Sequence, residues 1–175
     1  MDNISIHNII ENLKSGNNDF YIYGNGTIAK LLFLTIEDCG ISSKCKGFIV
    51  TSKDYGIENF CNMPVFSLQC KKRMDLEFDK VIIAAYPERQ MEMINNLREY
   101  KVAEIFVVTQ TMIDEMECIY VENIRDSIRN DGNQYDILLM SSDNLLTSGA
   151  FRCLLDLSCE LKKNNLSFLV VLPCF

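Results

Sequence analysis

The sequence predicts an α/β protein with a Rossmann-like, doubly wound parallel sheet. The candidate strands are continuous apolar runs, as expected of strands buried on both faces of a parallel sheet. These runs alternate with segments of helical periodicity, and right-handed crossovers join such units almost without exception. In addition, a glycine turn separates the first strand from the helix that follows it. Together these observations favour a Rossmann-like domain over residues 1–118.

The elements at the start of this domain follow from spacing and from glycine. Apolar residues recur at helical spacing over residues 1–16, which predicts a leading helix that stops near Gly16. Residues 20–23 form a compact aromatic and β-branched run, typical of a buried strand. The segment "TIAKLLFLTIEDCG" is apolar on nearly every side and predicts a covered helix that ends at Gly40.

The remaining elements of this domain repeat the same alternation. Strands are expected around residues 48–50 and 65–66, in "DKVIIAA", and in "EIFVV" from residue 104. A helix beginning at Pro87 separates the last two strands, since proline is favoured in the first turn of a helix. The helical segment "TQTMIDEME" completes the domain, and its carboxylates Asp114, Glu115 and Glu117 are interpreted as a solvated face.

A second unit is predicted after a polar connecting helix and linker at residues 119–134. Residues 135–175 contain a strand, "YDILLMSS", a helix, "TSGAFRCLLDLSCELKKNN", and a second strand, "LSFLVVLP". Two parallel strands and one helix cannot bury a core of their own. These strands therefore either extend the first sheet or form the truncated start of a second Rossmann-like domain, and the second alternative is favoured.

Composition excludes several classes of protein. The formal charge of −7 argues against a nucleic-acid partner, and the one basic cluster, Lys71–Arg73, is diluted by Asp75. The eight cysteines include no Cys-x-x-Cys pair and lie far from the single histidine, so no metal site is assigned. The start is not a signal peptide, and no apolar run approaches the roughly 20 residues of a membrane helix. We expect a cytoplasmic protein, and the apolar leading helix could pair with a second copy.

The glycine loop after the first strand suits an anion. Gly24 permits a backbone conformation closed to other residues, and Gly26 would let a phosphate oxygen approach the main chain. The helix start supplies unpaired N–H groups and a positive dipole end, while Thr27 could cap the helix or donate to the same phosphate. The alternative is that both glycines only form a tight turn. An NAD site is disfavoured, because no acidic residue stands at the end of the second strand.

The runs "FYIYGNGTIAK", "KGFIVTSKD", "MPVFSL" and "DKVIIAAYPERQMEMINNLREY" resemble the N-terminal Rossmann-like domain of bacterial sugar acyltransferases and glycan-assembly enzymes. Such domains hold a UDP-sugar or act as fused regulatory modules. The hexapeptide repeats of the acyltransferases are absent, so acyl transfer is not expected. The resemblance implies a nucleotide lying over the glycine loop, with its ribose or base near the loop after the second strand and with an opposite lip beyond "VIIAA". The implied contacts are Gly24, Asn25, Gly26, Thr27, Thr51, Ser52, Asp54, Ala85 and Tyr86.

The second unit, "ILLMSSDNLLTSGAFRCLLDLSCELKKNNLSFLVVLP", resembles the opening of a GT-B glycosyltransferase of the retaining family-four type. That family places a small-residue loop and an arginine before a leucine-rich helix, which here implies Ser148, Gly149 and Arg152 as contacts for an acceptor or a diphosphate. Ser148 departs from the glycine usual at that point. The sugar-donor half of such an enzyme would lie beyond Phe175.

These observations lead to one expected function and two alternatives. We expect a nucleotide-sugar-binding or regulatory module of a bacterial glycosyltransferase that assembles surface polysaccharide. Its partners would be a nucleotide sugar and a glycan acceptor, with no resident cofactor and no catalytic residue in this chain. The alternatives are a non-catalytic Rossmann-like binding module and, less favoured, an NAD-dependent oxidoreductase domain.

Overall fold

The computed structural model describes residues 5–16, 18–52, 58–69, 77–130, 132, 134–140 and 149–171. The chain divides into two compact units, Met1–Asn123 and Ile124–Phe175. Each unit has a sheet of its own.

Unit 1 is built on a six-stranded sheet in the order β3-β4-β2-β1-β5-β6. All neighbouring strands are parallel except β3 and β4, which form an antiparallel pair at one edge. The predicted Rossmann-like α/β fold is therefore confirmed. The strand bounds are β1 Phe20–Tyr23, β2 Cys45–Val50, β3 Asn59–Phe60, β4 Met63–Ser67, β5 Glu77–Ile83 and β6 Lys101–Val107.

The strand order contains a topological switch point between β1 and β5. From β1 the chain moves outward through β2 to β4, and it then returns to the other side of β1 to form β5 and β6. The loops that leave β1 and β5 therefore run in opposite directions from the same edge of the sheet. In open α/β sheets this reversal opens a crevice at the carboxyl ends of the strands, where ligands bind.

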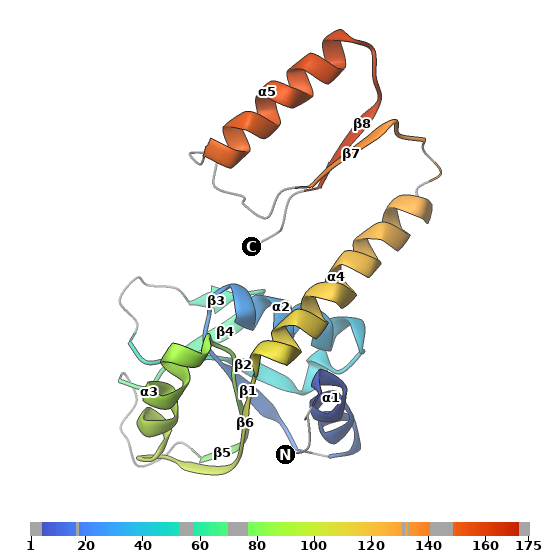
Figure 1. Ribbon diagram of the computed structural model, residues 1–175. Coiled ribbons are helices and arrows are strands. Elements are labelled where there is room, and N and C mark those ends of the chain that lie inside the picture. Colours follow the sequence, from blue (N-terminus) through green and yellow to red (C-terminus); the bar gives the residue numbers. More distant parts are fainter. Residues whose placement is uncertain are drawn as a thin grey trace. The chain divides into compact units, whose positions relative to one another are not determined.

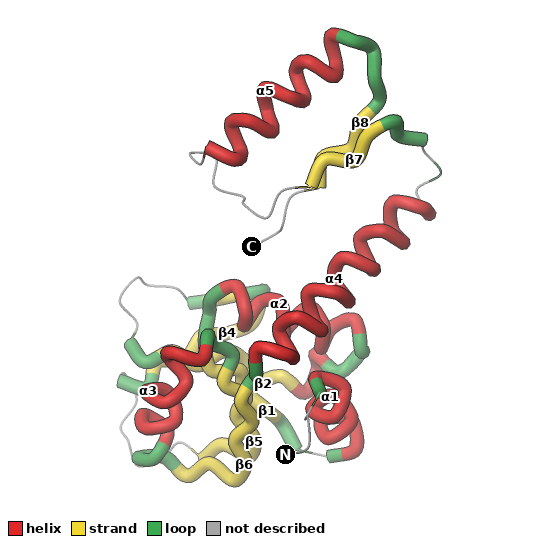
Figure 2. Tube along the Cα trace, viewed as in Figure 1, coloured by secondary structure: helices red, strands yellow, loops and turns green. Residues whose placement is uncertain are grey.

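Helices cover both faces of the sheet, as Figures 1 and 2 show. On one face lie α1 (Ile6–Ser15), α2 (Thr27–Asp38) and the first part of α4 (Gln110–Asn130), and on the other lies α3 (Pro87–Leu97). A short 3-10 helix, Ser42–Lys44, precedes β2. Alternate strand residues serve the two layers, with Ile22 in the larger core and Tyr23 in the core under α3. This two-sided burial explains the continuous apolar strands.

The leading helix α1 is an integral part of unit 1. Its four apolar residues, Ile6, Ile9, Ile10 and Leu13, are at most 4% exposed and belong to the larger core. That apolar face is therefore not available to a second copy of the chain, although it was the basis for expecting self-association. The oligomeric state stays a prediction without this support.

Residues from distant segments hold both ends of α1. Glu115 of α4 accepts a hydrogen bond from the Ile6 N–H at 2.8 Å, so it caps the helix start. The Lys44 Nζ donates to the carbonyl oxygens of Leu13, Lys14 and Gly16 at 2.9, 3.0 and 2.6 Å. A cation at a helix C-terminus also interacts favourably with the helix dipole. The interpretation of Glu115 as part of a solvated face was wrong, because its carboxylate bonds to the backbone of α1.

Lys80 links α1 to the sheet. Its side chain is 9% exposed, and its Nζ donates to the Asn12 side-chain oxygen and lies 3.4 Å from a carboxylate oxygen of Glu104. A buried charge with its partners in place is tolerated, whereas removal of a single partner is strongly destabilising. Lys80 thus joins β5, β6 and α1.

Unit 2 contains β7 (Ile137–Met140), α5 (Gly149–Lys163) and β8 (Phe168–Val171). The two strands are parallel and pair with each other in a two-stranded sheet. Residues 119–130, expected in the connecting helix and linker, continue α4, which is a single helix across the unit boundary.

None of the helices among the described residues combines the length and the apolar character needed to cross a lipid bilayer.

Burial raises the pKa of the Cys45 thiol to about 11, because a thiolate at that position would lose its hydration. Cys45 therefore remains a neutral thiol, and it packs as a small apolar side chain.

The Lys44 contacts predict a clear loss of stability on substitution. Lys44→Met removes the donors to three helix carbonyls and should lower the free energy of unfolding by about 1–3 kcal/mol. Urea denaturation followed by circular dichroism measures the change. Lys46→Met is the matched control, since it removes only the exposed ion pair with Asp19 and should cost less than about 1 kcal/mol. Equal losses for the two variants would contradict the capping role of Lys44.

Candidate functional site: a cleft at the switch point

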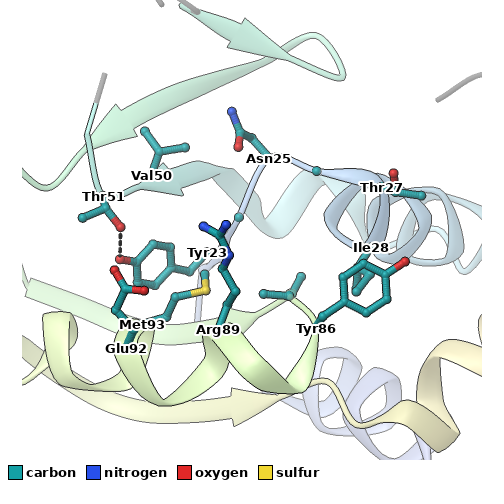
Figure 3. A pocket seen from close by; sticks show the side chains of 14 residues that line it. Tyr23, Asn25, Thr27, Ile28, Val50, Thr51, Tyr86, Arg89, Glu92 and Met93 are labelled. Carbon is teal, nitrogen blue, oxygen red and sulfur yellow. Dashed lines mark hydrogen bonds between the residues drawn. The ribbon is translucent and has the colours of Figure 1, made fainter. Parts of the chain in front are cut away.

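A cleft of about 330 Å³ opens at the switch point between β1 and β5. The β1–α2 loop forms one wall, the β5–α3 loop and the first turns of α3 form the other, and the end of β2 closes one side (Figure 3). The lining residues are Tyr23, Gly24, Asn25, Gly26, Thr27, Ile28, Val50, Thr51, Ala84, Ala85, Tyr86, Arg89, Glu92 and Met93.

Gly24 follows β1 directly, and it allows the main chain to leave this strand between the neighbouring strands β2 and β5. Its φ angle is +130°, a conformation that side-chain-bearing residues rarely adopt, and its N–H donates to the Ile49 carbonyl at 2.9 Å. A Cβ at this position would lie 2.6 Å from the Ala84 carbonyl oxygen of the loop after β5. Only glycine therefore fits where the main chain passes between β2 and β5.

Gly26 has a different role, because it leaves space open. It is the N-cap residue of α2, its backbone is extended, and its carbonyl accepts the Lys30 N–H at 3.1 Å. Among the described residues, a Cβ added here would meet no atom within 4 Å, and Gly26 as N-cap residue offers no side chain to cap the helix start. Thr27 is the first helical residue rather than the cap, and it is exposed. The first residues of α2 line the cleft, and within the described part of the chain their N–H groups have no side-chain acceptor.

The opposite wall carries the charged groups of the cleft. Pro87 begins α3, which places Arg89 and Glu92 on successive turns of the face that lines the cleft. Among the described residues, Arg89 is the one positively charged side chain in the lining, and its guanidinium has no hydrogen bond or ion pair there. Figure 3 shows Arg89 pointing from α3 toward the glycine loop at Asn25.

Two side-chain amides fix the position of α3 against the sheet. Asn96 donates to the Tyr23 hydroxyl at 3.2 Å and to the Thr51 hydroxyl at 3.4 Å, and these two hydroxyls are themselves 2.7 Å apart. Gln90 donates to the carbonyl oxygens of Ala85 and Val108 at 2.8 and 2.7 Å. These contacts hold the helix that carries Arg89 and Glu92, so both side chains start from a defined backbone.

The structure brings most of the expected contacts of unit 1 together. Gly24, Asn25, Gly26, Thr27, Thr51, Ala85 and Tyr86 all line the cleft, whereas Ser52 does not. Asp54 and Ser148 lie outside the described residues. Gly149 is the first residue of α5 and Arg152 lies in its first turn, in unit 2.

Sequence reasoning missed the α3 side of the cleft. Arg89, Glu92 and Met93 lie in the helix that was predicted to begin at Pro87, but no role in a site was assigned to them. A helix that begins directly after a buried strand must present one side of its first turns to the carboxyl edge of the sheet. That constraint could have singled out Arg89.

Among the residues that the structure describes, the lining contains no histidine and no cysteine, and the Thr51 hydroxyl is bonded to Tyr23 and Asn96. Within the described ranges, no group of three or more His, Cys, Asp or Glu side chains is placed to hold a metal ion. Comparison of the chain with family models, with curated proteins and with solved structures gave no match.

The two glycines predict opposite effects on stability. Gly24→Ala imposes a strained backbone and a contact with Ala84, so it should lower the free energy of unfolding by about 2 kcal/mol or more. Gly26→Asp introduces a favoured N-cap residue into open space and should raise it by a few tenths to about 1 kcal/mol. Chemical denaturation of both variants tests this contrast, and a destabilised Gly26→Asp variant would contradict the open N-cap.

Proposed function

We propose that unit 1 binds the diphosphate of a nucleotide sugar and serves as a binding or regulatory module of a bacterial glycosyltransferase that assembles surface polysaccharide. One observation carries the proposal: Arg89 points across the cleft toward the glycine loop at Asn25, which leads into the start of α2 at the topological switch point. A helix N-terminus and a guanidinium on opposite walls are complementary to a phosphate between them.

The net charge of the chain implies that any bound anion is held by local groups in the cleft. The formal net charge is −7, so the overall field does not attract anions to the surface. An anion would therefore be held by short-range donors, which here are the N–H groups of Gly26 and Thr27 and the Arg89 guanidinium. The volume of about 330 Å³ falls within the range of small-molecule sites.

The remaining parts of the lining support a nucleotide over a simple inorganic anion. Beyond the phosphate position, the walls are apolar and aromatic at Ile28, Val50, Tyr86 and Met93, as expected of a site for a larger ligand. An NAD cofactor is less favoured, because the described residues at the end of β2, Thr51 and Ser52, are neutral.

The glycosyltransferase part of the proposal is supported by unit 2 alone. The order β7–α5–β8 with parallel strands agrees with the opening β–α–β unit of a GT-B domain. Gly149 begins α5, as expected of a small-residue loop that leads into a leucine-rich helix. In this proposal unit 2 contacts a glycan acceptor.

Arg89→Ala should weaken UDP-sugar binding by about tenfold or more, because a charge-assisted hydrogen bond to phosphate is lost. Isothermal titration calorimetry with a panel of UDP-sugars, UDP and NAD measures the effect. Arg98→Ala is the matched control, since Arg98 is exposed at the other end of α3 and does not line the cleft. Gly26→Asp should abolish binding while it preserves the fold.

Three results would contradict the proposal. The first is a lack of saturable binding by any UDP-sugar. The second is binding of NAD in preference to them, which would favour the oxidoreductase alternative. The third is equal loss in the Arg89→Ala and Arg98→Ala variants, which would place the ligand elsewhere.

A further inference from the structure

A second cavity adjoins the cleft on the β4 side. Its volume is about 310 Å³, and Thr51 lines both cavities. The side-chain amides of Gln69, Asn95 and Asn96 contribute to its lining. Amides present both donors and acceptors, the groups that pair with the edge of a nucleobase. A ligand whose phosphates lie at α2 could therefore extend its nucleoside end past Thr51.

Glu92 lines the cleft on the side of Thr51, the residue that the cleft shares with the second cavity. It follows Arg89 by three residues, so the two side chains leave adjacent turns of the same face of α3. In Figure 3 its carboxylate points toward the end of the cleft where Thr51 and Tyr23 are joined, whereas Arg89 points toward the glycine loop. Among the described residues, the Glu92 carboxylate accepts no hydrogen bond and forms no ion pair.

A carboxylate at this position needs an explanation if the cleft binds an anion. Glu92 opposes the binding of phosphate through like-charge repulsion, so a site for a bare anion would gain affinity from its loss. A carboxylate is, however, an acceptor for two neighbouring hydroxyl groups, as in the recognition of ribose by acidic residues at the end of the second strand of dinucleotide-binding folds. In this chain Thr51 and Ser52 occupy that strand end, and they carry no charge.

We propose that Glu92 recognises the ribose hydroxyls of the bound nucleotide from α3, with the nucleoside directed toward the cavity lined by Gln69, Asn95 and Asn96. This inference rests on the proposed function, and it specifies the ligand as a ribonucleoside diphosphate or its sugar ester. Glu92 is a specificity-determining residue in this arrangement. A 2′-phosphorylated nucleotide is rejected, because its added charge would face the carboxylate.

The test compares UDP, 2′-deoxy-UDP and inorganic pyrophosphate on the full chain by calorimetry. The wild-type chain should bind UDP about tenfold or more tightly than 2′-deoxy-UDP, since a hydrogen bond to a charged acceptor is lost. Glu92→Gln should reduce this preference to about threefold or less, because the bond becomes neutral. The same variant should bind pyrophosphate as tightly as the wild type or more tightly.

A reduced preference for UDP over 2′-deoxy-UDP, together with unchanged or tighter binding of pyrophosphate, distinguishes recognition of the ribose from a general effect of charge. Glu88→Gln is the matched control, because Glu88 is exposed in the first turn of the same helix and does not line the cleft. It should leave the preference for UDP over 2′-deoxy-UDP unchanged.

Failure of this inference is distinguishable from failure of the proposed function. Suppose that UDP binds and that Arg89→Ala weakens its binding. If Glu92→Gln then leaves the preference for UDP over 2′-deoxy-UDP intact, or strengthens the binding of UDP and of pyrophosphate equally, the role of Glu92 is overturned and the nucleotide site stands. Equal binding of UDP and 2′-deoxy-UDP by the wild-type chain would overturn the role of Glu92 in the same way. If neither UDP nor any UDP-sugar binds, both proposals fall together.

Discussion

The site depends on the close passage of Gly24 between β2 and β5. Its N–H is bonded to Ile49 on one side, and on the other side no room remains for a Cβ beside the Ala84 carbonyl. Because the chain leaves β1 in this confined path, α2 begins directly above the carboxyl edge of the sheet, at the point where the strand order reverses. The unpaired N–H groups of that helix start therefore face a cleft rather than bulk solvent. Gly26, two residues later, has no such neighbours and leaves the approach open.

Helix α3 forms the wall of the cleft opposite the glycine loop, and side-chain hydrogen bonds hold it in a fixed position. Asn96 ties α3 to the ends of β1 and β2, and Gln90 ties its first turns to the loops that follow β5 and β6. These bonds link side-chain amides to hydroxyl and carbonyl groups at the edge of the sheet, so they hold the helix without occupying the cleft. Arg89 and Glu92 project from this fixed helix with opposite charges. A ligand with an anionic end and a hydroxyl-rich part matches that order of charges along the cleft.

The sequence was sufficient for the larger elements and for one wall of the cleft. Apolar runs located the main strands, and the glycines and Pro87 marked where α2 and α3 begin. The sequence was insufficient wherever a side chain bonds to a segment far away along the chain, as Glu115 and Lys44 do at the two ends of α1. The hairpin of β3 was also missed, because its turn residues Cys61 and Asn62 have φ angles of 51° and 60° without the usual Asn-Gly signal. Arg89 and Glu92 were missed for a related reason, since helical spacing does not show which side of a helix faces the sheet edge.

The central claim is that main-chain N–H groups at the start of α2 bind a negatively charged ligand. Nuclear magnetic resonance of the ¹⁵N-labelled chain during a titration with UDP tests it most directly, because each backbone amide is observed separately. The account predicts that the largest shifts fall on the amides of Gly26, Thr27 and Ile28, together with the side-chain Nε of Arg89. Saturation of binding without a response from these amides, or with shifts centred on another part of the chain, would contradict it.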